Sequence, residues 1–121
     1  LQQTLSEERL QQIMLLSQHI IVAQHIKQAA VQLILLTQPH QQSPGNHFRY
    51  GASPRGLQSL IRTARVHALL NNRLQVDLDD LEAMALATLR HRVLLTMESE
   101  LKGVDSDTLL KQVIQSWREQ H

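Results

Sequence analysis

The sequence predicts one all-α domain of five helices. Hydrophobic residues make up 42% of its 121 residues but aromatic residues only 2%, so the core must consist mainly of aliphatic side chains, which favour helices over a β-sandwich. Apolar residues recur at helical spacing along most of the chain. A chain of this length supports one modest core. Short apolar segments between the helices leave room for short extended pairings.

The first helix is expected to open at Thr4, which forms a capping box with Glu7. Residues 19–22 are apolar and β-branched, so an extended segment is expected there. A second helix runs from Gln24 to Thr37 and is stopped by Pro39. Its predicted buried stripe contains Ile26, Ala29, Ala30, Leu33, Ile34 and Thr37, widened by Val31, Leu35 and Leu36.

A long loop over residues 39–52 leads into a third helix from Pro54 to Asn71. Arg55, Ser59 and Arg62 share one side of this helix. The opposite side is predicted to face the core with Leu57, Leu60, Ile61, Ala64 and Ala68. Residues 74–76 form a second candidate extended segment.

Asp77 is the predicted N-cap of the fourth helix, with Asp79 and Asp80 at the positive end of its dipole. The basic run 90–92 marks the end of this helix, and residues 93–95 follow as a candidate strand. Asp105 is expected to cap the fifth helix. The apolar stripe of that helix contains Leu110, Val113, Ile114 and Trp117.

The segment Gly51–Gly56 is the strongest candidate for a binding site. Ser53 is a predicted N-cap, Pro54 suits the first helical position, and Arg55 falls in the first turn, where the helix dipole opposes a cation. Free backbone N–H groups beside a guanidinium form a site for an anion, most plausibly phosphate. A solvated arginine that tolerates the dipole explains the same residues equally well.

The sequence contains no complete catalytic or metal-binding motif. The two glycines of Gly51–Gly56 are spaced as in a P-loop, but Leu57 and Gln58 replace the lysine and the hydroxyl residue that the P-loop requires. The seven histidines match no metal-ligand spacing, and helix capping accounts for Asp77, Asp79 and Asp80 without a metal. With no cysteine, the sequence offers neither a disulfide nor a thiolate site.

Charge is segregated along the chain. No acidic residue lies between Glu8 and Asp77, whereas the remainder carries nine acidic and five basic residues. Either a basic surface meets a negatively charged partner, or glutamine has replaced acidic residues on solvated faces. Arginines at 55, 62, 65 and 73 predict a basic helix, but the scarcity of aromatic residues argues against a reader of single-stranded nucleic acid.

The chain is expected to be a soluble, cytoplasmic piece of a longer protein. It has no apolar run of the ~20 residues that a membrane span needs and no signal-peptide pattern. It begins at Leu1 rather than at methionine.

Five segments resemble the C-terminal lid of MoxR-type AAA+ ATPases over residues 8–115. They are Phe48–Arg55, Leu60–Arg65, Val76–Leu81, Leu89–Val93 and Glu100–Val104. The order of the motifs is more specific than any one of them. The sequence departs from the family at Gln38, where an arginine usually follows the threonine, so a role for Gln38 in anion contact is not carried over.

This resemblance implies that residues 1–121 form a five-helix, lid-type bundle, with the Walker motifs in an upstream α/β domain. Arg55 would be the sensor 2 arginine, and Ser53, Pro54 and Arg55 would contact ATP, whose Mg²⁺ the upstream domain holds. The parent would form rings that remodel or mature protein complexes, often with von Willebrand A domain partners, while the lid alone would be inactive. The alternative is a stand-alone helical adaptor that binds an acidic protein or nucleic acid through a basic face.

Overall fold

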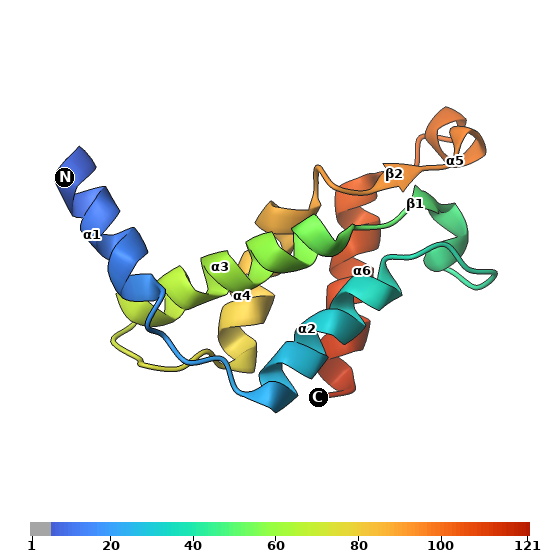
Figure 1. The fold of residues 1–121 in the computed structure, drawn as a ribbon. Coiled ribbons are helices and arrows are strands. Elements are labelled where there is room, and N and C mark those ends of the chain that lie inside the picture. Colours follow the sequence, from blue (N-terminus) through green and yellow to red (C-terminus); the bar gives the residue numbers. More distant parts are fainter. Residues whose placement is uncertain (1–5) are drawn as a thin grey trace.

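The computed structural model describes residues 6–121, which form six α-helices, one short 3₁₀-helix and two short strands (Figure 1). In chain order the elements are α1 (Glu7–Ser17), α2 (Gln24–Leu36), η1 (Gly45–His47), β1 (Phe48–Tyr50), α3 (Pro54–Leu70), α4 (Leu78–Leu89), β2 (Leu94–Leu95), α5 (Met97–Leu101) and α6 (Ser106–Glu119). The all-α prediction is confirmed. The predicted count of five helices is wrong because it omits α5.

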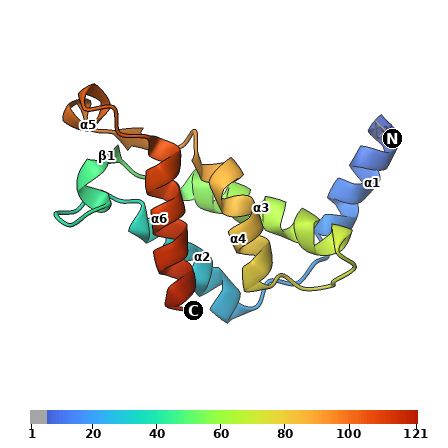
Figure 2. The same cartoon turned by 180° about the vertical axis from the view of Figure 1, so that it is seen from behind.

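Helices α2, α3, α4 and α6 form the body of the domain. Figure 2 shows α4 and α6 on one side of this body, in front of α3 and α2. The indole of Trp117 on α6 is fully buried, and its Nε1–H donates to the carbonyl of Ala29 on α2 at 2.8 Å. This bond satisfies the polar atom of a large core side chain and ties two helices that are distant in sequence.

Two parts project from opposite ends of this body (Figure 1). Helix α1 packs mainly against α3. At the other end, β1 and β2 pair antiparallel, with Phe48 opposite Leu95 and Tyr50 opposite Leu94. His47 Nδ1 lies 2.8 Å from Ser99 Oγ, which joins the start of this two-stranded sheet to α5.

Several local predictions hold and others need correction. Residues 94–95 form a strand, and Ile21 forms a parallel bridge with Gln75, as the apolar segments predicted. Helix α1 begins at Glu7, capped by Ser6; the predicted cap, Thr4, lies outside the described residues. The predicted loop 39–52 contains η1 and β1.

Helix α2 is less buried than its composition predicted. Its main stripe is buried, including Ile26, Leu33 and Ile34. Val31 and Leu35, however, are 40% and 60% exposed, because they lie one turn apart on a side of α2 that lines an open groove rather than the core. On α3 the predicted core side holds, although Leu57 and Ile61 are only half-buried.

Candidate functional site

The turn before α3 is fixed to the end of α2. The buried Thr37 hydroxyl accepts a hydrogen bond from the Ala52 N–H at 3.0 Å and donates to the Ile34 carbonyl at 2.6 Å. Gln38 Nε2 donates to the Ala52 carbonyl at 2.8 Å. A Cβ at Gly51 would clash with the Thr37 carbonyl oxygen, so this close backbone approach requires glycine. The position of the turn is therefore set by α2.

The first turn of α3 has no side-chain cap among the described residues. Ser53 has the extended backbone of an N-cap and Pro54 is the first helical residue, as predicted. The predicted side-chain cap is wrong, because Ser53 makes no capping hydrogen bond. The first backbone bond of the turn runs from the Leu57 N–H to the Ser53 carbonyl at 3.2 Å, so the N–H groups of Arg55 and Gly56 have no acceptor within residues 6–121.

Arg55 is exposed at this helix end and has no hydrogen-bond or ion-pair partner in the described part of the chain. A second guanidinium lies nearby: Arg92 Nη2 donates to Ser59 Oγ on α3 at 3.0 Å. Gly56 permits this arrangement, since a Cβ there would lie 3.4 Å from Arg92 Cδ and 3.2 Å from Ala52 Cβ. The sequence marked Arg92 only as part of a helix end, and nothing in its spacing placed it against α3.

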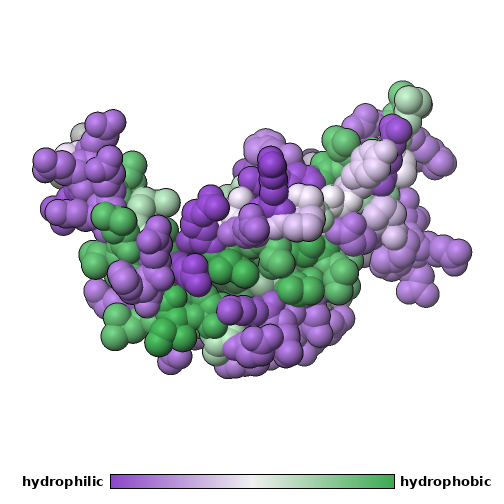
Figure 3. Space-filling view, viewed as in Figure 1, coloured by the Kyte–Doolittle hydropathy of each residue, from purple (hydrophilic) through white to green (hydrophobic). Residues whose placement is uncertain are grey.

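A groove of about 550 Å³ adjoins the same turn. It lies between the end of α2 and the start of α3, on a side of the molecule where apolar surface gathers in Figure 3. The guanidinium carbon of Arg49 lies 5.3 Å from the centre of the Tyr50 ring, in the range of a cation–π contact. The mainly apolar lining includes Val31, Leu35, Pro39, Tyr50, Pro54 and Leu57. An apolar groove and a cationic helix start therefore lie side by side.

The opposite end of α3 holds a closed ion-pair cluster. Asp80 is fully buried; its Oδ2 lies 2.6 Å from Arg73 Nη1, and its Oδ1 lies 2.7 Å from Arg73 Nη2. His67 Nδ1 lies 2.6 Å from Oδ1, and the Asp77 N–H donates to Oδ2 at 2.7 Å. Arg73 thus belongs to an internal cluster and not to the predicted basic surface. Asp80, predicted only as a dipole partner, is the centre of that cluster.

The cluster shifts the ionisation of both partners. Burial raises the pKa of Asp80, but the hydrogen bonds from His67, the Asp77 backbone and Arg73 outweigh it, and the pKa lies below its usual value. The hydrogen bond to Asp80 raises the pKa of Arg73 in turn. Both groups are therefore held in their charged forms, and the capping box of Asp77 and Asp80 fixes the start of α4.

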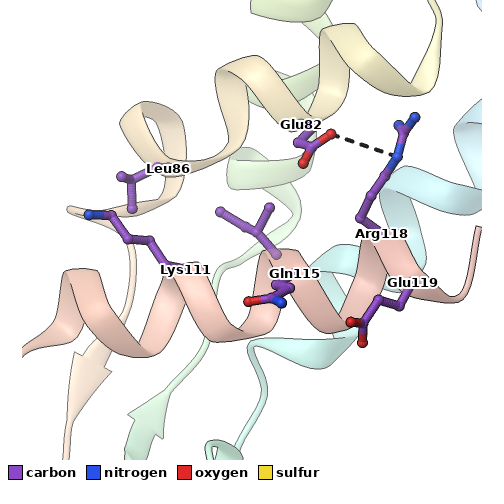
Figure 4. A pocket seen from close by; sticks show the side chains of 7 residues that line it. Glu82, Leu86, Lys111, Gln115, Arg118 and Glu119 are labelled. Atoms are coloured by element: carbon purple, nitrogen blue, oxygen red, sulfur yellow. Dashed lines mark ion pairs between the residues drawn. The ribbon is translucent and has the colours of Figure 1, made fainter.

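A groove of about 630 Å³ between α4 and α6 has a different character (Figure 4). Arg118 Nη2 lies 2.9 Å from Asp79 Oδ1, and its Nε lies 3.7 Å from Glu82 Oε1. Lys111 and Glu119 also line the groove. Charges of both signs, with Arg118 held between two carboxylates, are typical of a solvated face.

Neither a metal-binding cluster nor a membrane-spanning helix occurs among residues 6–121. Among residues 6–121, no group of three or more histidine, aspartate or glutamate side chains is placed to hold a metal ion. None of the described helices combines the length and the apolar character needed to cross a membrane.

Comparison with known proteins gives the class of this domain. The profile of the AAA lid domain matches residues 45–113, more than half of the chain, and the chain belongs to that family. The matched segment contains the whole of α3 and α4, and therefore both Arg55 and the Asp80 cluster.

Two particular proteins resemble the chain. It is 29% identical over 97 residues to the uncharacterized Bacillus subtilis protein YeaC, an alignment that covers 80% of this chain and 29% of YeaC. Its fold matches the crystal structure of a putative ATPase from Cytophaga hutchinsonii with a TM-score of 0.73 and 23% identity, covering 83% of this chain and 32% of that one. The chain thus spans less than a third of the length of either protein, and the second likeness shows the shared fold.

Proposed function

We propose that residues 1–121 are the C-terminal lid of a MoxR-type AAA+ ATPase. In this proposal the lid couples ATP binding and hydrolysis to the remodelling or maturation of protein complexes. The main observation in its support is Arg55, which is exposed at the start of α3 and has no ion-pair partner among residues 6–121. It lies inside the segment that matches the AAA lid domain. The Walker motifs would lie in an upstream α/β domain.

Ser53, Pro54 and Arg55 are the proposed nucleotide-contacting residues. The Arg55 N–H, which has no acceptor within residues 6–121, offers a donor to a phosphate oxygen, and the Arg55 guanidinium adds a charge-assisted bond as the sensor 2 arginine. Tyr50, Pro54 and Leu57 line the adjoining groove and offer an apolar wall for a base. Bound ATP, with its Mg²⁺ held mainly by the upstream domain, would supply the phosphate charge that Arg55 senses.

The anchoring of the turn suggests how a change at Arg55 reaches the rest of the lid. Thr37 and Gln38 bind the Ala52 backbone, and both residues directly follow α2. A displacement of the Arg55 turn therefore carries α2 with it, and Trp117 links α2 to α6. We propose that the lid moves as one body against the upstream domain and the neighbouring subunits of a ring, and that von Willebrand A domain proteins are candidate partners.

The test is to measure steady-state ATP hydrolysis by the full-length protein with and without Arg55→Ala. Loss of a charge-assisted bond made only near the transition state lowers kcat by roughly tenfold to a hundredfold. A bond made equally in the bound ground state raises KM by a similar factor instead. Lys27→Ala, which removes an exposed cation from α2, is the matched control and leaves both constants unchanged.

The lid chain alone provides the blank for this assay, because it contains no complete P-loop. Unchanged kinetics in Arg55→Ala would rule out the sensor 2 assignment. A gene whose upstream region lacks a Walker A motif would rule out the AAA+ proposal altogether.

A further inference from the structure

A second cationic pocket lies where α1 crosses α3, apart from the Arg55 turn. Its volume is about 380 Å³. Helix α1 contributes Met14 and Ser17, followed by Gln18, and α3 contributes Gln58, Ile61, Arg62 and Arg65. The α3 residues recur at three- and four-residue spacing and so share one side of the helix. Figure 1 shows α1 meeting α3 well away from the β1–β2 pair.

The cations of this pocket lack carboxylate partners in the described part of the chain. Arg62 is exposed and forms no ion pair, and the Nε of Arg65 is buried without a hydrogen-bond partner. No acidic residue occurs in the sequence between Glu8 and Asp77, so the neighbouring sequence cannot supply one. In the α4–α6 groove, by contrast, Arg118 pairs with two carboxylates, although its Nη1 is buried without a hydrogen-bond partner among the described residues.

An unpaired buried donor is costly unless a ligand satisfies it. Two arginines that line one pocket offer several N–H donors to an oxyanion such as a carboxylate. The amide groups of Gln18 and Gln58 can add hydrogen bonds from either helix. The pocket therefore has the chemistry of a carboxylate site.

Apolar side chains border these polar groups. Met14 and Ile61 line the pocket, and on α1 Leu10 and Leu15 are 49% and 60% exposed. No aromatic residue lines the pocket, so it offers no platform on which nucleic-acid bases could stack. An apolar border around two arginines suits a short protein segment better than a phosphate backbone.

We propose that the α1–α3 pocket binds an acidic side chain of a protein partner, flanked in the partner's sequence by apolar residues. Arg62 and Arg65 bind the carboxylate, and Met14 and Ile61 contact the apolar neighbours. Seven residues of helix separate Arg62 from Arg55, about 10 Å along α3. The proposed carboxylate contact is therefore made by residues other than the proposed nucleotide-contacting ones.

Fluorescence anisotropy of labelled peptides tests the site on the 121-residue chain. The probe is a fluorescein-labelled nine-residue peptide of alternating glutamate and leucine; its matched partner replaces every glutamate with glutamine. We expect binding of the acidic peptide that weakens with added salt, and at least tenfold weaker binding of the amide peptide. A labelled 20-nucleotide single strand is the third probe and is expected to bind weakly, with no dependence on Arg62 or Arg65.

Variants then locate the site. Arg62→Gln with Arg65→Gln is expected to weaken peptide binding by about tenfold to a hundredfold, the scale of a lost charged hydrogen bond. Arg62→Gln alone changes an exposed side chain, keeps the fold and still weakens binding several-fold. Arg9→Gln removes an exposed guanidinium elsewhere on α1 and leaves binding unchanged. Equal binding of the two peptides, equal effects of all three variants, or tight oligonucleotide binding lost in the Arg62 variant would each overturn the proposal.

Discussion

The arginines near the two ends of helix α3 have opposite surroundings. At its start, Arg55 is exposed, without a carboxylate partner among the described residues, beside backbone N–H groups that no side chain caps. Beyond its end, Arg73 makes two hydrogen bonds to the buried carboxylate of Asp80, which His67 on the last turns of α3 also contacts. The arginine at the start of α3 is therefore available to a ligand, whereas the arginine beyond its end is part of the fold.

The difference follows from the helix caps. At α4 the Asp77 side chain and the Asp80 side chain complete a capping box, so the chain itself supplies the negative charge that a helix start favours. At α3 no acidic residue occupies the first turn, and Arg55 stands there instead. Of these two helix starts, the one without an internal anion is the one that we propose binds an external anion.

Removing the carboxylate at the closed end is expected to have the largest effect. Asp80→Asn lowers the free energy of unfolding by about 3 kcal/mol, near the bottom of the range for a broken buried ion pair, because Arg73 can turn to water. The Arg73 side chain is 34% exposed, so water can reach it. Urea unfolding followed by circular dichroism measures the change.

The neighbouring Asp79→Asn is the matched control for this substitution. Asp79 is 67% exposed and pairs with Arg118 on the surface, so its loss costs at most about 1 kcal/mol. Equal losses of stability in the two variants would show that the Asp80 cluster has no special structural role.

Acid is expected to have a smaller, graded effect through the same residue. Because the pKa of Asp80 is lower in the folded chain than in the unfolded chain, its contribution is complete above the unfolded value near 4. This contribution is lost as the pH falls through the folded value. Urea midpoints measured from pH 7 to pH 2 should therefore fall less steeply for Asp80→Asn than for the unsubstituted chain. Parallel curves would contradict the shifted pKa.

Periodicity predicted the helical body well because local rules determine it. The apolar spacing of α6 and the punctuation at Pro39, Pro54 and Asp77 identified elements whose bounds agree with the structure to within about one residue at most ends. The order of motifs around Arg55 also indicated the AAA lid domain family, to which the chain belongs.

Contacts between distant residues lay beyond these rules. Helix α5 has five residues and too short an apolar repeat, although Thr96 caps it by accepting the Ser99 N–H. The sequence showed Asp80 as a helix-start residue, but only tertiary packing brings His67 and Arg73 to it. Arg92 reached α3 in the same way, from the far end of α4. The sequence could predict the chemical character of each site residue, but not which distant residue it contacts.

The most direct test of this account compares the melting temperatures of Arg55→Ala and Arg73→Ala in the 121-residue chain. Each variant removes one arginine, from opposite ends of the α3 region. Arg55→Ala is expected to leave the melting temperature within roughly 3 °C of the unsubstituted chain, as for an ordinary surface change. Arg73→Ala is expected to lower it clearly more, because it leaves Asp80 buried without its main cation. Equal shifts, or a larger fall for Arg55→Ala, would contradict the division between a binding arginine and a structural one.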